Sequence, residues 1–240
     1  MKAQRFENVD SLVNRTVEEV KRILSEKPDA VFCFACGETP RPVMGKLIKM
    51  NREGEIDFSR ARFVGLDEWV GVGRQTIGSC KQMLYDDFFT PLDLREDQIT
   101  LFNGLSNDLQ TEIRKINSLI SDLGIDFVLL GVGMNGHIGL NEPGCDTDLE
   151  AHIVDLSEMT IKVMTKYFSK EMSLTKGISL GFAQLLKAKN IYLIATGKRK
   201  AIIVEKIINS CPTNLLPATL LKDSLYESNF YVDSEAGFFI

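Results

Sequence analysis

Four side chains with acid–base or hydrogen-bonding chemistry lie within eight residues of the chain: Asn135, His137, Asn141 and Glu142. An imidazole has a pKa near neutrality and can carry a proton to or from a substrate, and a neighbouring carboxylate can fix its tautomer and support its charged form. A lone histidine more often bonds only to its own loop. The clustering found here favours proton transfer.

The same segment contains a glycine pattern typical of dinucleotide-binding proteins. Residues 131–136 (GVGMNG) match G-x-G-x-x-G, follow an apolar run, and precede Asp155 by 19 residues. In a nucleotide site a helix begins within the glycine run and continues, so that its N-terminus meets the pyrophosphate. Gly139, Pro143 and Gly144 would interrupt the first two turns of such a helix. We therefore expect a catalytic loop at this position.

A second acidic segment, residues 67–71 (DEWVG), follows an apolar run at 61–66. Asp67 and Glu68 stand beside Trp69, the only tryptophan, so one of the two acids could be a general base in partly desolvated surroundings. Adjacent residues of an extended segment point in opposite directions, and only one of the two is expected to face a site. A solvated acidic turn is the alternative that this pattern leaves open.

Two further loops could hold an anion. In residues 37–40 (GETP), Thr39 could cap a helix that begins at Pro40 and leave backbone donors for the anion, although Glu38 would repel it. Residues 197–200 (GKRK) place three cations where a helix begins, a position that the helix dipole disfavours. A bound phosphate would explain the cations. The alternatives are a plain capped turn and a solvated basic turn.

The five cysteines indicate reduced thiols. Their number is odd, and Cys33 and Cys36 form a C-x-x-C pair in and just after a β-type apolar run. The sequence has no second cysteine or histidine pair with the spacing of a zinc site. We therefore expect buried or loop-edge thiols, and no metal.

Strands and helices that alternate along the chain must position these loops. Apolar runs predict strands at 30–35, 61–66, 99–102, 126–130, 151–156 and 191–195, with a last one near the C-terminus. Helical periodicity predicts helices from Asp10 or Ser11, from Asp108, and near 40–48, 79–89, 157–168 and 199–208. This order predicts an α/β, Rossmann-like fold: a doubly wound, mainly parallel sheet with helices on both faces, as a single domain over residues 1–240. Ligands of such sheets bind beyond the carboxyl ends of the strands, where the loops described above lie.

Composition narrows the class of protein. The 240 residues are 44% apolar and 25% charged, a balance typical of globular proteins. A net charge of −5 without a long basic run argues against a nucleic-acid partner. The sequence has neither a signal-like start nor an apolar stretch of 18 residues, so we expect a cytoplasmic protein without a membrane partner.

Together the four loops resemble the glucosamine-6-phosphate deaminase/isomerase family over nearly the whole chain. The most specific element is residues 131–143 (GVGMNGHIGLNEP). The related 6-phosphogluconolactonases share the fold and the start of this segment, but residues 141–143 match the deaminases. Residues 66–70 (LDEWV), 37–40 and 197–201 (GKRKA) match other loops of the family.

The resemblance implies a hexosamine-6-phosphate deaminase/isomerase that forms a ketose 6-phosphate and ammonia without a metal or organic cofactor. It implies that His137, supported by Glu142 and Asn135, opens the sugar ring, and that Asp67 moves a proton from carbon 2 to carbon 1. The residues that it implies in substrate and phosphate binding are Gly37, Glu38, Thr39, Gly136, Lys166 and Lys200.

Two positions depart from the family pattern. Glu38 stands where the family usually has a small residue, which bears on the geometry of the phosphate loop. Asn135 stands where many members have Asp, which would shift acid–base duty to His137 and Glu142.

The substrate epimer is a finer inference from the same resemblance. Trp69, residues 78–80 (GSC) and residues 94–98 (LREDQ) look closer to the galactosamine-6-phosphate branch, whose product is tagatose 6-phosphate, than to the branch that forms fructose 6-phosphate from glucosamine 6-phosphate. Two alternatives stay open: a 6-phosphogluconolactonase-like hydrolase and a non-catalytic sugar-phosphate sensor. The resemblance also allows a homo-oligomer.

Overall fold

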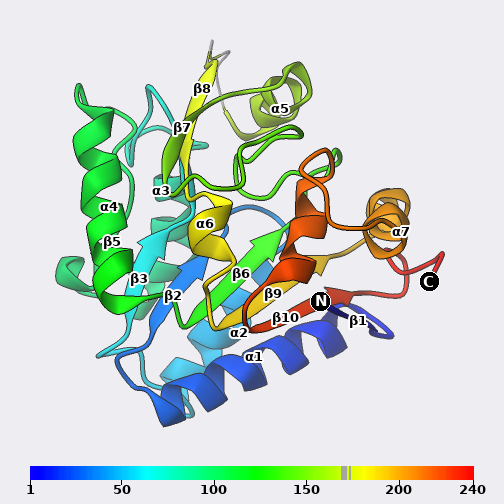
Figure 1. Ribbon diagram of the computed structural model, residues 1–240. Coiled ribbons are helices and arrows are strands. Elements are labelled where there is room, and N and C mark those ends of the chain that lie inside the picture. The colour runs from blue at the N-terminus through cyan, green and yellow to red at the C-terminus, as the bar shows by residue number, and fades with distance from the viewer. Residues whose placement is uncertain (169–171, 173) are drawn as a thin grey trace.

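A seven-stranded parallel sheet forms the centre of the molecule, in the order β1-β10-β9-β6-β2-β3-β5 (Figure 1). The computed structural model describes residues 1–168, 172 and 174–240. The strands of this sheet are Lys2–Arg5 (β1), Val31–Phe34 (β2), Arg62–Gly65 (β3), Ile99–Thr100 (β5), Phe127–Gly131 (β6), Asn190–Ala195 (β9) and Glu227–Val232 (β10). The α/β fold with a mainly parallel sheet, predicted from the sequence, is confirmed.

Two hydrophobic cores lie on the two faces of this sheet. Side chains alternate along a strand, so Val31 and Cys33 of β2 enter one core while Phe32 and Phe34 enter the other. A strand that is buried on both faces needs an uninterrupted apolar run. This requirement explains why the central strands could be recognised in the sequence.

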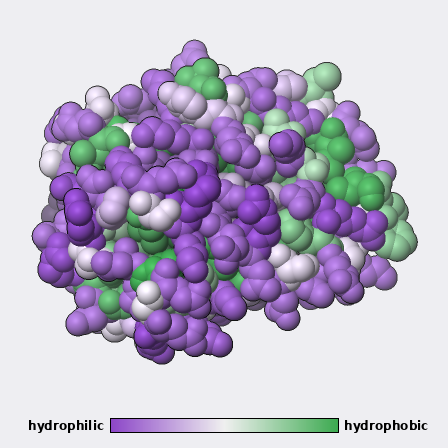
Figure 2. Space-filling model, turned by 90° about the horizontal axis from the view of Figure 1, so that it is seen from below, coloured by the Kyte–Doolittle hydropathy of each residue, from purple (hydrophilic) through white to green (hydrophobic). Residues whose placement is uncertain are grey.

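Helices cover both cores. One face carries Leu109–Leu123 (α4), Phe182–Leu185 (α6) and Ala201–Asn209 (α7); the other carries Val9–Glu26 (α1), Arg41–Arg52 (α2), Cys80–Leu84 (α3) and the π-helical Tyr85–Phe89 (η1). The remaining short helices are Thr90–Leu92 (η2), Glu96–Gln98 (η3), Glu158–Met164 (α5), Thr165–Tyr167 (η4), Lys198–Lys200 (η5) and Pro217–Asp223 (η6). The side of the molecule on which α1 lies presents a mainly hydrophilic surface with smaller apolar patches (Figure 2). Among the described residues, the helices are too short or too polar to span a bilayer.

The first helix begins earlier than predicted. Asn8, and neither Asp10 nor Ser11, is its N-cap. The Asn8 side chain accepts a hydrogen bond from the Ser11 backbone N–H, and the Ser11 hydroxyl accepts one from the Asn8 backbone. This reciprocal capping box fixes the start of the helix at Val9.

A second, antiparallel sheet stands at one end of the main sheet (Figure 1). It consists of Asp67–Trp69 (β4), Lys176–Ser179 (β8) and His152–Asp155 (β7), in the order β4-β8-β7. The strand predicted at 151–156 therefore exists, but it lies outside the parallel sheet. β1, β4 and β8 were not predicted.

The order of the strands creates a crevice. From β2 the chain moves through β3 to β5 on one side, whereas β6, β9 and β10 lie on the other side of β2. The loops that leave β2 and β6 therefore diverge at a topological switch point. The sequence predicts a ligand site at such a point.

Candidate active site

A cavity of about 910 Å³ lies at the carboxyl ends of β2, β3, β6 and β9. All four loops singled out in the sequence contribute to its wall, through residues 35–40, 66–67, 131–134 with His137, and 196–200. Among the predicted site residues, the cavity wall contains Gly37, Glu38, Thr39, Asp67, His137, Lys166 and Lys200. The fold thus brings into one cavity side chains that are far apart in the sequence.

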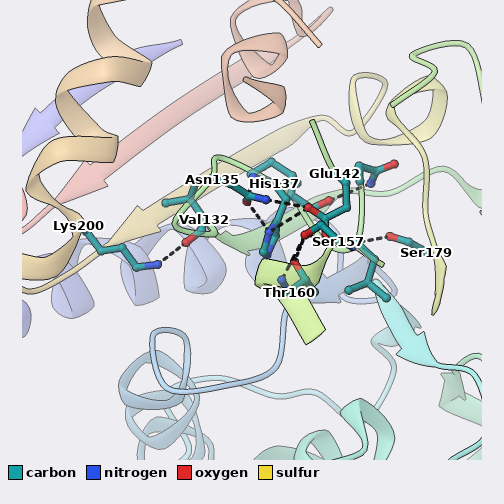
Figure 3. A network of polar contacts seen from close by, with 11 residues as sticks. Val132, Asn135, His137, Glu142, Ser157, Thr160, Ser179 and Lys200 are labelled. Carbon is teal, nitrogen blue, oxygen red and sulfur yellow. Dashed lines mark hydrogen bonds and ion pairs between the residues drawn. The ribbon is translucent and has the colours of Figure 1, made fainter. Parts of the chain in front are cut away.

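Asn135 connects His137 to Glu142 behind the cavity wall (Figure 3). Its Nδ2 donates a 2.8 Å hydrogen bond to Glu142 Oε2, and its Oδ1 lies 2.7 Å from His137 Nδ1. The imidazole Nδ1 is itself 3.8 Å from Glu142 Oε2. An ionised carboxylate only accepts hydrogen bonds, so it fixes the orientation of the amide, and the amide oxygen then accepts a hydrogen bond from Nδ1–H. His137 is thereby held in the tautomer whose Nε2 carries the lone pair.

Two residues that the sequence analysis missed complete the support of Glu142. Ser157 Oγ donates to Glu142 Oε1 at 3.0 Å, and Thr160 adds a further hydrogen bond. Burial acts to raise the pKa of Glu142, but these bonds, the bond from Asn135 and the charge of His137 outweigh it and lower the pKa. Burial lowers the pKa of His137, and Glu142 opposes that shift. At neutral pH the pair is therefore an anion beside a neutral imidazole.

The glycine pattern of residues 131–136 leaves room for the imidazole of His137. No helix follows it within the loop at 132–150, in agreement with the rejection of a nucleotide site. A Cβ atom on Gly133 would lie 2.3–2.5 Å from Cε1, Nδ1 and Nε2 of His137. The imidazole therefore packs flat against the backbone of Gly133, where only glycine fits.

The adjacent acids of the second loop have different environments. Asp67 lines the cavity. Glu68 is 1% exposed and accepts hydrogen bonds from Ser79 Oγ and from the backbone N–H groups of Trp69, Cys80 and Lys81. Only one of the two acids therefore lines the cavity, as the alternation of side chains along an extended segment predicts. Burial, together with the charge of Glu68, raises the pKa of Asp67 to about 7.

Asn141 belongs to the scaffold of the loop that carries His137. Its side chain is fully buried and donates to the backbone carbonyls of Ile138 and Leu180 at 2.9 and 2.8 Å. Gly139 has a φ of +57°, and a Cβ there would lie 2.8 Å from Ser179 Oγ and 3.5 Å from Asp67 Oδ2. Because Gly139 has no side chain, the histidine loop can approach Ser179 and the Asp67 carboxylate closely.

One part of the cavity wall is cationic. Lys200 Nζ donates a 2.6 Å hydrogen bond to the Val132 carbonyl (Figure 3), and burial lowers the pKa of Lys200. The N-terminal ends of α2 and α7 adjoin this region, and unpaired backbone N–H groups at a helix start attract anions. Lys166 also lines the cavity, but its Nζ lies 3.4 Å from Glu38 Oε2.

Three details of these loops differ from the sequence-based expectation. The helix after Thr39 begins at Arg41, and Pro40 occupies the N-cap position, where a proline side chain cannot accept a hydrogen bond. Gly136 is outside the cavity wall; it turns with a φ of +86°, and a Cβ there would meet Leu216. The expected substrate contact of Gly136 therefore has no support in the geometry.

Asp233 is a further residue that the sequence analysis missed. It is buried at the end of β10, and both of its carboxylate oxygens accept a hydrogen bond from the Gly197 N–H at 3.1 Å. This contact orients the loop that carries Lys200. A single acid after a short strand gave no signal in the sequence.

The fold and the cavity define a doubly wound α/β protein whose pocket is lined by acid–base groups and by several lysines. The chain belongs to the glucosamine-6-phosphate isomerase/6-phosphogluconolactonase family, whose profile matches residues 3–228.

Its relatives match over almost their full length. The glucosamine-6-phosphate deaminase of Thermoanaerobacter sp. (strain X514) is 35% identical over 95% of this chain and 91% of its own, and that of Bacillus pumilus (strain SAFR-032) is 36% identical over 97% of each. A solved structure described as a monomeric glucosamine-6-phosphate deaminase superposes with a TM-score of 0.94, at 31% identity and full coverage of both chains.

Proposed function

We propose that the protein is a glucosamine-6-phosphate deaminase that converts its substrate into fructose 6-phosphate and ammonia. The observation that carries the proposal is one cavity whose wall combines a tautomer-fixed imidazole, a buried carboxylate and Lys200, the residue at the N-terminus of α7. The named relatives, which are glucosamine-6-phosphate deaminases, support the same activity.

The first step opens the sugar ring. Nε2 of His137 takes the proton of the anomeric hydroxyl and delivers it to the ring oxygen, so that the hemiacetal becomes an open aldose. During this transfer the imidazole carries a positive charge, which the nearby Glu142 carboxylate stabilises. Asn135 holds His137 in the tautomer whose Nε2 can accept the proton.

The second step moves a proton between adjacent carbons. Asp67 takes the proton from carbon 2 and returns it to carbon 1. A second proton passes from the amine to the oxygen on carbon 1, so that carbon 1 becomes a hydroxymethyl group and an imine is left at carbon 2. Water adds to this imine, and ammonia leaves. A base that works near neutral pH needs a pKa close to 7, and burial gives Asp67 such a value.

The phosphate anchors the substrate at the cationic part of the cavity wall. Lys200 and the backbone donors near Gly37 and Thr39 would hold it, joined by Lys166 once that side chain leaves Glu38. Binding energy at this remote group fixes the orientation of the reacting carbons. The same anchor would serve a 6-phosphogluconolactone, so the lactonase alternative has to be separated by assay.

Galactosamine 6-phosphate is the second candidate substrate. The observation that favours it is that Trp69 and Cys80, two of the residues behind that inference from the sequence, both line the cavity. The relatives named above carry the glucosamine name, and we therefore give glucosamine 6-phosphate precedence.

The test is ammonia release in a coupled assay, with glucosamine 6-phosphate and galactosamine 6-phosphate in parallel. We expect release with a higher kcat/KM for glucosamine 6-phosphate; a higher value for the other epimer would reverse the substrate assignment. Hydrolysis of 6-phosphogluconolactone without ammonia release would indicate the lactonase. Thermal stabilisation by both sugars without product would indicate a sensor.

A further inference from the structure

Two thiols and a carboxylate converge in the wall of the cavity. One ligand-type atom from each of Cys36, Asp67 and Cys80 lies within 4.8 Å of the other two. All three residues line the cavity, so a small ion can reach them from it. Cys33, the other half of the C-x-x-C pair, points into the hydrophobic core instead.

We propose that Cys36, Asp67 and Cys80 bind a thiophilic divalent cation of the zinc class, and that the bound ion inhibits turnover because it occupies the Asp67 carboxylate. The inhibition rests on the proposed function, in which Asp67 is the base. The binding of the ion does not depend on that function.

The geometry is close to that of a zinc site. Zinc binds thiolate sulfur at about 2.3 Å and carboxylate oxygen at about 2.0–2.2 Å, so neighbouring ligand atoms of a tetrahedral site lie about 3.6–3.8 Å apart. The separations here, at most 4.8 Å, need shifts of about 1 Å to reach those values. Three protein ligands leave a fourth position open toward the cavity, as in zinc sites that bind an exogenous ligand.

The charge around the cluster also suits a cation. The carboxylate of Asp67 lies beside both thiols, and a carboxylate oxygen of Glu68 lies beside the Cys80 backbone. A divalent ion would displace the two thiol protons to solvent and supply the positive charge that this group of potential anions lacks. Glu68 is placed to support such a site, since it accepts a hydrogen bond from the Cys80 N–H at 3.0 Å.

The binding test is an anaerobic titration of the reduced full chain with Co²⁺, followed by the thiolate-to-cobalt charge-transfer absorption and by displacement with Zn²⁺. We expect one ion per chain. Cys36→Ser and Cys80→Ser should each weaken binding by about ten-fold or more, since even a supporting partner of a ligand contributes roughly 10–100-fold to metal affinity. Cys211→Ser removes an exposed thiol outside the cavity and should change nothing. Equal binding by the wild type and both cavity variants would overturn the site.

The inhibition test compares turnover with and without Zn²⁺, each protein relative to its own metal-free rate. We expect the wild type to lose activity that a chelator restores, and Cys80→Ser to need about ten-fold more Zn²⁺ or greater. An active enzyme that binds no Co²⁺ would refute the metal site and leave the proposed function standing. A bound ion that leaves turnover intact would confirm the site and contradict both the inhibition and the role of Asp67 as base.

Discussion

The ammonium group of Lys166 lies 3.4 Å from the Glu38 carboxylate across the cavity wall. A cation expected at the phosphate is thus paired with an acid from the very loop that is expected to bind the phosphate. Both side chains are largely exposed, at 46% and 75%, so the pair is held weakly and can open.

Replacing this acid should improve substrate binding. We expect Glu38→Gln to lower the KM for the sugar phosphate by up to about five-fold, since exposed ion pairs are worth roughly 0.2–1 kcal/mol. Steady-state kinetics measure the change, and Lys166→Met provides the control. If Glu38 acts by masking Lys166, the gain should shrink in the Lys166→Met background, whereas an equal gain there would show that Glu38 repels the phosphate directly.

Lys200 is the cation expected to contribute most to phosphate binding. Lys200→Ala should raise KM by about ten- to one-hundred-fold, because a charge-assisted hydrogen bond is worth roughly 1.5–3 kcal/mol. Lys206→Ala, which removes an exposed charge outside the cavity from α7, the helix that follows Lys200, should leave KM unchanged. An unchanged KM in Lys200→Ala would place the phosphate elsewhere.

The protonation state of Asp67 should make both the activity and the stability of the protein depend on pH. Asp67→Asn removes the base and should reduce turnover by roughly 10²–10⁴-fold, whereas the sugar phosphate should still raise the melting temperature. In the wild type, kcat/KM should rise with pH up to about 7, since the base acts when deprotonated. Activity near the wild-type level in Asp67→Asn would remove this residue from the role of base.

Stability should change with pH in the opposite direction from activity. The unfolded state loses the Asp67 proton near pH 3.8 and the folded state near 7, so between these values the folded state holds more protons and stability falls as pH rises. Asp67→Asn should therefore raise the melting temperature at pH 8 and leave it nearly unchanged below pH 4. Each ~1 kcal/mol corresponds to about 2–4 °C in a chain of this size. A difference that does not vary with pH would contradict the raised pKa.

The tautomer of His137 can be observed directly because the chain has only two histidines, His137 and His152. In ¹⁵N-histidine spectra, His137 should carry its proton on Nδ1 and titrate below the ordinary histidine value. The variant His152→Gln assigns the signals. Asn135→Ala should remove the preference of His137 for this tautomer and lower kcat/KM by about ten-fold or more. This loss is a part of the rate enhancement that a positioned acid–base group contributes. A proton on Nε2 in the wild type would refute the proposed proton path.

The sequence revealed the elements that carry a strong local signal. The central strands are apolar on both faces, and the loops after them contain the groups whose chemistry can be recognised. β1 has four exposed residues (KAQR), and β4 and β8 span only three and four residues. Such strands exist because a neighbour pairs with them, and pairing between distant segments leaves no periodic pattern in the sequence.

The same limit applies to the site. The sequence identified Asp67 and His137 through residue type and position after a strand. It could not show that Cys80 lies beside Cys36, or that Ser157 supports Glu142, because those contacts join segments 44 and 15 residues apart. Only the fold supplies those distances.

Gly133 offers a steric test of the whole arrangement. Gly133→Ala places a methyl group where a Cβ would lie 2.3–2.5 Å from three atoms of the His137 ring, so the imidazole must move. A shift of about 1 Å in a reacting group can cost roughly 10²-fold in rate, and we expect a loss of that order in kcat together with altered His137 signals. Gly131→Ala adds the same methyl two residues earlier, where a Cβ meets no atom within 4 Å, and should leave those signals in place. Full activity in Gly133→Ala with a displaced ring would show that the position of His137 does not limit turnover.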